Sequence, residues 1–159
     1  MRIKMFAGFV MAMVFAALAL SVSAGTADQQ SGTWKMNAVN SKYSPGPAPK
    51  SNTVKIESDA ENFNLSSDGI DAAGKATHIE YTAKFDGKDY PVTGAQNTDT
   101  VALARLDAST IQSTLKKAGE VVMTVKTVIS VDGKTRTSTF TGKDAQGHDV
   151  NNVVAYDKL

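Results

Sequence analysis

The stretch THIEYTAKFDGK, residues 77–88, alternates apolar and polar side chains before it ends in a glycine turn. Ile79, Tyr81 and Phe85 share one face of the predicted strand and the polar residues share the other, which is typical of a half-buried β-strand. The Asp-Gly pair that follows suits a tight hairpin, because glycine takes a positive φ at little cost. The stretch therefore predicts one strand of an antiparallel hairpin.

Short segments of this kind continue from Thr53 to Asp157, and none has a helical period. Further reversals are expected at Asp68-Gly69, 117–120 and 132–134. A sheet of roughly eight to ten strands can close into a barrel, which removes both exposed edges. We therefore expect an all-β fold, a single up-and-down antiparallel β-barrel of roughly eight to ten strands over residues 32–159. A β-sandwich is the alternative.

The N-terminal segment that ends at Ala24 has the layout of a secretory signal peptide. Arg2 and Lys4 precede an apolar run over residues 6–20, and small residues follow up to Ala24. The run is shorter than the roughly 20 apolar residues that a membrane span needs. We expect residues 1–24 to be cleaved as a signal peptide, residues 25–31 to be a flexible lead-in, and the mature protein to be periplasmic or secreted, without stable membrane insertion.

Composition narrows the function classes. The chain has no cysteine, so the fold depends on its core and its sheet without disulfides. The formal net charge is +1, and acidic and basic residues are interspersed without a basic block, so nucleic-acid binding is not expected.

The pattern of chemically active residues also argues against an enzyme. No G-x-S-x-G, G-x-G-x-x-G or phosphate-loop pattern is present, so no catalytic residue and no cofactor is expected. His78 and His148 are the only histidines. His78 and Glu80 share a strand face, but no third ligand is visible, and no metal site is predicted.

Tyr43–Lys50 contains three prolines in five residues, which prevents a sheet ladder. This strap is expected to cover one end of the barrel. The strand over residues 135–141 carries Phe140 as its one large apolar residue. Either a polar interior or an exposed sheet face on that side accounts for this composition.

Gly32-Thr33-Trp34-Lys35-Met36 resembles the G-T-W-K-L opening of the intracellular fatty-acid-binding proteins and the G-x-W of lipocalins. The terminal Tyr156-Asp157-Lys158 resembles the last strand of the fatty-acid-binding branch. Together with S-P-G-P-x-P-K-S over residues 44–51, the chain is similar to uncharacterised exported bacterial lipocalin-like proteins. The resemblance covers most of the mature chain and implies a calycin-like barrel.

The chain departs from the fatty-acid-binding proteins in two places. The proline strap stands where those proteins have two helices. Their carboxylate motif, R-x-Y, corresponds here to Val154-Ala155-Tyr156, so the tyrosine matches and the arginine does not. The resemblance therefore implies a barrel but not a particular ligand.

The predicted interior residues come from several strands. Arg105 shares a strand face with Val101 and Leu103; if that face is inward, its guanidinium must meet an anion or a carboxylate. If the face is outward, Arg105 is an ordinary surface residue. A tryptophan on a first strand most often closes a barrel end rather than contacts a ligand. The candidate ligand-binding residues are Trp34, Tyr81, Phe85, Arg105, Met123 and Tyr156.

The expected function is an exported lipocalin-like binding protein for a small amphipathic or apolar ligand. The alternative is a protein-interaction module of the cell envelope, such as an inhibitor or a chaperone-like partner, that uses the strap and the hairpin loops.

Overall fold

The computed structural model describes residues 28–159, which form one antiparallel sheet of ten strands without a helix in that range. The segment predicted to be a signal peptide lies outside the described residues. Over the described range, no helix is long and apolar enough to cross a membrane. The strands are β1 (Gly32–Lys42), β2 (Ser51–Ser58), β3 (Asn62–Ile70), β4 (Ala76–Lys84), β5 (Asp89–Pro91), β6 (Thr100–Arg105), β7 (Thr110–Lys117), β8 (Glu120–Ile129), β9 (Thr135–Lys143) and β10 (Asp149–Lys158).

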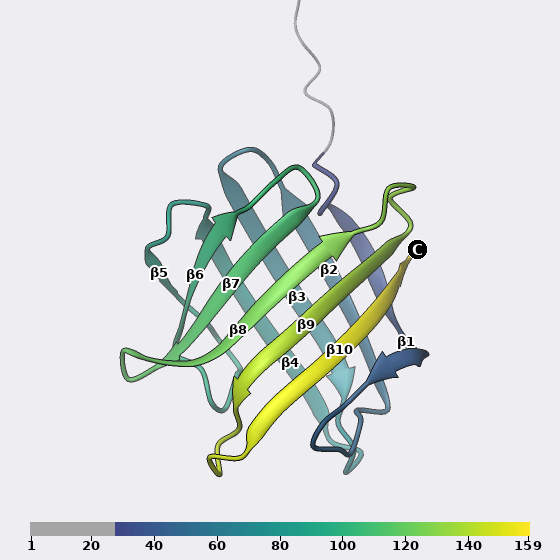
Figure 1. Ribbon diagram of the computed structural model, residues 1–159, viewed down its shortest axis with the longest axis vertical. Helices are drawn as coiled ribbons and strands as arrows, with labels where there is room; N and C mark the ends of the chain where they lie inside the picture. The colour runs from purple at the N-terminus through teal and green to yellow at the C-terminus, as the bar shows by residue number, and fades with distance from the viewer. Residues whose placement is uncertain (1–27) are drawn as a thin grey trace, which may run out of the picture.

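The sheet curves until its first and last strands meet. The strand order is β4-β3-β2-β1-β10-β9-β8-β7-β6-β5, and β1 pairs with β10 from Trp34↔Lys158 to Asn37↔Ala155 and again, after an irregularity, at Lys42↔Val153. In Figure 1, β7–β10 form the front wall and β2–β4 the wall behind it. This arrangement confirms the predicted up-and-down barrel over the two-sheet sandwich.

The barrel closes at a seam between β4 and β5. One bridge spans this seam: Glu80 N–H donates to the Thr93 carbonyl at 3.1 Å, and Thr93 N–H donates to the Glu80 carbonyl at 2.9 Å. Pro91 of β5 has no N–H to continue a ladder, and a proline within a sheet is typical of an edge strand. The barrel is therefore nearly closed, with its weakest pairing at the seam.

The reversal expected at Asp68-Gly69 is wrong. Both residues lie inside β3, where Gly69 pairs with Asn52. A Cβ on Gly69 would lie 2.7 Å from the Ser51 carbonyl oxygen, so this glycine permits a close backbone approach instead of a turn. The chain reverses after β3, where Lys75 N–H donates to Asp71 Oδ1 at 2.8 Å. The glycines of the other expected reversals, Gly87, Gly119 and Gly133, do take a positive φ.

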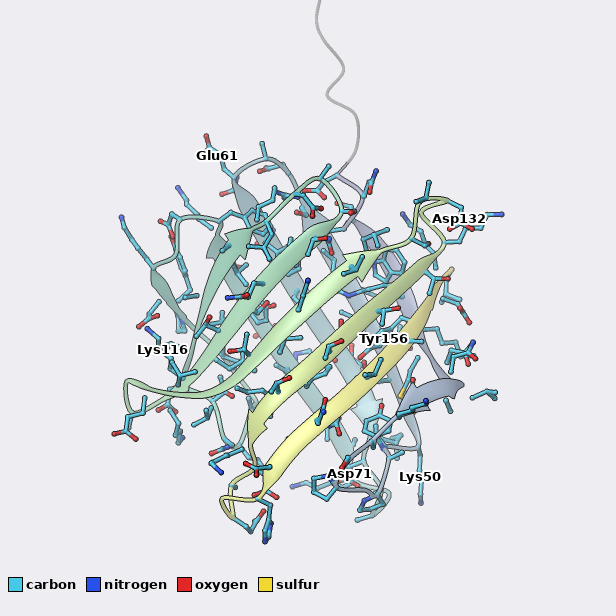
Figure 2. All side chains as sticks on the ribbon, viewed as in Figure 1. Lys50, Glu61, Asp71, Lys116, Asp132 and Tyr156 are labelled. Carbon is cyan, nitrogen blue, oxygen red and sulfur yellow. The ribbon has the colours of Figure 1, made fainter. Side chains whose placement is uncertain are left out.

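One end of the barrel is filled by large side chains; we call it the packed end. Trp34, Phe63, Leu103 and Ile111 have almost no exposed surface there. Phe85 packs edge-on against Phe63, with ring centroids 5.7 Å apart. Figure 2 shows Glu61 and Asp132 on turns at this end, and Lys50 and Asp71 at the opposite end.

Residues 28–31 belong to the packed end. Gln30 has no exposed surface, and its Nε2 donates to the Ser109 carbonyl at 3.1 Å. The Gln30 carbonyl accepts the indole N–H of Trp34 at 3.0 Å, which gives the buried ring the partner it requires. The contacts of residues 28–31 thus help to fill the barrel end, whereas residues 25–27 of the predicted flexible lead-in lie outside the described residues.

The proline segment Tyr43–Lys50 lies at the opposite end, which we call the strap end. Ser44 N–H donates to Asn152 Oδ1 at 2.8 Å, and Asn151 N–H donates to the Ser44 carbonyl at 2.7 Å. The Tyr43 ring packs against the core, and its hydroxyl donates to the sulfur of Met36 at 3.1 Å. The strap is therefore tied to β10 and β1.

Candidate functional site

A cavity of about 190 Å³ lies inside the barrel, between the packed end and the strap end. Its front wall comes from β7–β10 and its rear wall from β2–β4 (Figure 1). The lining residues are Val54, Leu65, Ser67, Ile79, Tyr81, Val92, Ala95, Thr98, Ser113, Leu115, Val125, Thr127, Arg136, Ser138, Phe140 and Tyr156.

Polar side chains gather on the front wall. Alternation along β9 points Arg136, Ser138 and Phe140 into the barrel. Ser138 lies opposite Thr127 of β8, and their hydroxyl oxygens are 2.9 Å apart. We call Ser113, Thr127, Arg136, Ser138 and Tyr156 the polar cluster; every member is buried. The polar-interior explanation of the apolar-poor strand over residues 135–141 is thus the correct one.

Arg136 is a buried cation that has no counterion in the part of the chain that the structure describes. It is only 6% exposed, and no carboxylate within residues 28–159 forms an ion pair with it. Its Nη1 is buried and has no hydrogen-bond partner among the described residues. Burial lowers the pKa of the guanidinium from its usual value. A buried charge of this kind is costly unless it is paired, so an anion in the cavity would stabilise it.

Two tyrosines approach Arg136 from different strands. Tyr156 lies directly opposite Arg136 in the β9–β10 ladder, and Tyr81 reaches in from β4. Burial raises the pKa of each hydroxyl to about 12, and the positive charge of Arg136 partly opposes this rise in both. Both hydroxyls are therefore neutral near pH 7 and able to donate hydrogen bonds to an anion beside Arg136.

The rest of the cavity is mainly apolar. Leu65 and Ile79 face the polar cluster from the rear wall, and Val125 and Phe140 continue the front wall toward the strap end. The cavity therefore offers one charged, hydrogen-bonding region and one apolar region.

The loop after β5 covers the cavity at the seam. Val92, Ala95 and Thr98 of this loop line the cavity. Gly94 has φ +84°, and a Cβ there would lie 1.9 Å from the His78 carbonyl oxygen, so the loop lies directly against β4. Outside the seam, an open groove of about 550 Å³ shares Leu65 and Tyr81 with the cavity lining. The sheet at these two residues therefore lies between the cavity and the outer groove.

Arg105, the other arginine of residues 28–159, lies at the packed end and does not line the cavity. Its Nη2 pairs with Asp28 Oδ2 and donates to the Asp59 carbonyl at 2.9 Å. Its guanidinium carbon lies 4.1 Å from the centroid of the Phe85 ring. The carboxylate partner that an inward Arg105 requires is therefore supplied by the chain itself.

The structure separates the other predicted ligand residues. Tyr81 and Tyr156 both line the cavity. Trp34 and Phe85 lie in the packed end. Met123 is half-buried beside a shallow groove formed by β8, β9 and β10 near the strap end. The six predicted residues therefore do not form one site.

The histidines lie on the surface. His78 Nδ1 is 2.7 Å from Asp68 Oδ1, its cross-strand partner, and 51% of the side chain is exposed. His148 Nδ1 is 3.0 Å from Asp144 Oδ2 in the β9–β10 turn. Across the described chain, no group of three or more His, Asp or Glu side chains is placed to hold a metal ion.

Sequence reasoning missed Arg136 and most of the polar cluster. A signal was present, because Arg136 and Ser138 precede Phe140 by four and two residues and so share its strand face. If Phe140 points into the barrel, Arg136 must point into it as well, because side chains two and four residues apart lie on the same face of a strand. The register that puts Thr127 against Ser138 is not visible in either strand alone.

No protein-family model and no curated protein matches this chain. The ten-stranded barrel itself is compatible with a calycin-like fold.

Proposed function

We propose that this protein binds a small amphipathic ligand inside its barrel. The observation that carries the proposal is the division of the cavity lining into the polar cluster, with Arg136, and an apolar remainder. Cavities with apolar walls and a few placed polar groups are typical of small-molecule sites. A purely apolar ligand would leave the buried guanidinium without a partner, so the amphipathic class fits better.

The sequence supports the same proposal from a second direction. The resemblance to lipocalin-like exported proteins implies a barrel with an interior site. The segment ending at Ala24 predicts export, so the protein would act in the periplasm or outside the cell. We therefore propose an exported, non-enzymatic, lipocalin-like binding protein.

A cavity-filling variant tests the proposal. Ser67 lines the cavity from β3, and its neighbour Ser66 lines the outer groove. Ser67→Phe should fill the cavity, whereas Ser66→Phe adds the same ring outside it. Methyl NMR of Leu65, Ile79 and Val125 reports binding during titration with hexanol, hexanamide, hexanoate and hexylammonium.

We expect at least one of these molecules to shift the methyl resonances of the natural protein and of Ser66→Phe, but not those of Ser67→Phe. If none of them shifts the methyl resonances of the natural protein, or if folded Ser67→Phe binds as the natural protein does, the interior site is refuted.

A further inference from the structure

We propose that the ligand is a short-chain monocarboxylate and that Arg136 binds its carboxylate. This inference rests on the proposed function and narrows it to one chemical class. It follows from the charge balance of the cavity, the shape of the guanidinium and the size of the apolar region.

The charge balance calls for a single negative charge. Arg136 is the one ionised residue in the cavity lining, since the remaining lining side chains are apolar, hydroxyl-bearing or neutral tyrosines. One monoanion neutralises this cation. A dianion would bring a second buried charge with no cation near it in the cavity lining, which is costly.

The donors fit a carboxylate. A guanidinium is a planar fork whose parallel N–H groups match the two oxygens of a carboxylate. Nη1 has no acceptor within the described chain and almost no accessible surface, so a carboxylate that reaches the guanidinium would supply the partner that this buried group lacks. Burial raises the pKa of both Tyr156 and Tyr81, and the positive charge of Arg136 partly opposes this rise, which shows that the two tyrosines lie near it. Their neutral hydroxyls can donate hydrogen bonds to the same anion.

The size of the cavity limits the tail. Its volume of about 190 Å³ is below the roughly 300–1,000 Å³ of sites that enclose drug-sized ligands. Leu65, Ile79, Val125 and Phe140 offer apolar contact next to the polar cluster. A short hydrocarbon tail therefore fits between these residues, whereas a long chain would have to displace the loop that carries Val92 and Ala95.

A purely structural role for Arg136 makes a different prediction. A structural arginine stabilises the fold through its partners, so its removal destabilises the protein. An arginine that serves a ligand is an unpaired buried charge in the empty protein, and its replacement by an apolar residue of similar length should be neutral or stabilising. Thermal stability without ligand therefore separates the two roles.

Isothermal titration calorimetry tests the class of ligand. The probes are hexanoate, its neutral isostere hexanamide, hexylammonium, and acetate as an anion without a tail. We expect hexanoate to bind best, and dodecanoate to bind no better than hexanoate. In Arg136→Met, hexanoate affinity should fall by about 10- to 100-fold, as expected for charge-assisted hydrogen bonds, while hexanamide affinity stays the same.

Two further variants control the comparison. Arg136→Lys keeps the charge but loses the fork, and should bind hexanoate with intermediate affinity. Lys126→Met removes a positive charge from the exposed face of β8, and should bind as the natural protein does. Hexanoate affinity should also fall as pH drops through the carboxyl pKa, near about 4–5, because the arginine stays protonated.

The outcomes separate this inference from the proposed function. If hexanamide or hexylammonium binds as well as hexanoate, or if Arg136→Met binds hexanoate unchanged, the carboxylate assignment is wrong while an interior site remains. If none of the probes binds the natural protein, the proposed function fails with it. A folded Arg136→Met that melts well below the natural protein without ligand would also overturn the assignment, because it would show a structural arginine.

Discussion

The two arginines of the described chain both point into the barrel, but only one of them has a counterion there. At the packed end, Arg105 meets Asp28, a backbone carbonyl and the face of Phe85. In the cavity lining, Arg136 lies among hydroxyl-bearing side chains and pairs with no carboxylate of the described chain. Each arginine keeps one buried nitrogen without a hydrogen-bond partner in that range, Nε of Arg105 and Nη1 of Arg136, so the missing counterion is what distinguishes Arg136. The comparison teaches that burial alone does not mark a binding residue. The informative feature is a buried charge that lines a cavity and has no counterion in the described chain.

The difference extends to the surroundings of each arginine. Around Arg105, large side chains fill the packed end, and two of them, Trp34 and Phe63, are fully buried. Around Arg136, the lining residues stop short of filling the interior. We infer that the packed end supplies stability and that the cavity is preserved at some cost to it.

The largest expected effect is at the packed end. Trp34→Ala removes a fully buried ring and leaves the Gln30 carbonyl without its donor, so we expect a loss of about 3–5 kcal/mol in the free energy of unfolding. Phe140→Ala enlarges an existing cavity and should cost less than half as much. Urea denaturation measures both, and equal losses would show that the two regions are packed alike.

Removal of Arg105 should be the next most costly change. Arg105→Met leaves the Asp28 carboxylate, whose side chain is 8% exposed, without its cation. Because Arg105 itself is partly exposed, we expect a loss of about 2–3 kcal/mol, below the full cost of breaking a buried pair. Adding Asp28→Asn should recover part of the loss in a double-mutant cycle. Additive losses would mean that the pair is not coupled.

A smaller effect is expected where the loop meets the seam. Gly94→Ala combines a positive φ with a Cβ that overlaps the His78 carbonyl, so it should cost about 1–3 kcal/mol and displace the loop from the cavity. Gly87→Ala is the matched control, since Gly87 also has a positive φ but has open space around it. Chemical denaturation and limited proteolysis compare them; an equal cost would argue against the close contact.

The smallest effect concerns a surface pair away from both arginines. Hydrogen bonds to Asp68 and Glu80 raise the pKa of His78. A raised folded-state pKa means that the stabilisation is fully present below about pH 6.5 and is lost as pH rises through the folded pKa. The melting temperature of the natural protein should thus exceed that of His78→Gln slightly near pH 5.5, and the difference should shrink near pH 8.5. A difference that grows with pH would contradict this sign.

Local pattern was enough to predict the barrel but not the site. Alternation over residues 77–85 and glycine turns such as Gly87 identify strands and hairpins, because both signals are confined to neighbouring residues. Asp68-Gly69 failed because a glycine inside a strand looks the same as a glycine in a turn until its neighbour across the sheet is known. Arg105 was a candidate because it shares a strand face with Val101 and Leu103. The strand of Arg136 has few apolar residues, so its pattern did not indicate which face points into the barrel.

The site depends on contacts between residues distant in the sequence. Asp28 lies 77 positions before Arg105 and supplies the carboxylate partner that the guanidinium requires. Tyr156 faces Arg136 only because β9 and β10 pair in one register. Tyr81 reaches the same region from the opposite wall. No local period carries this information, so the comparison between the two arginines requires the folded chain.

Thermal denaturation of the natural protein and Arg136→Met, each with and without hexanoate, tests the central claim most directly. The variant should be at least as stable as the natural protein without hexanoate, because it no longer buries an unpaired charge. With hexanoate, the melting temperature of the natural protein should rise and that of the variant should not. A variant that is less stable without hexanoate and gains as much from it as the natural protein would contradict the account.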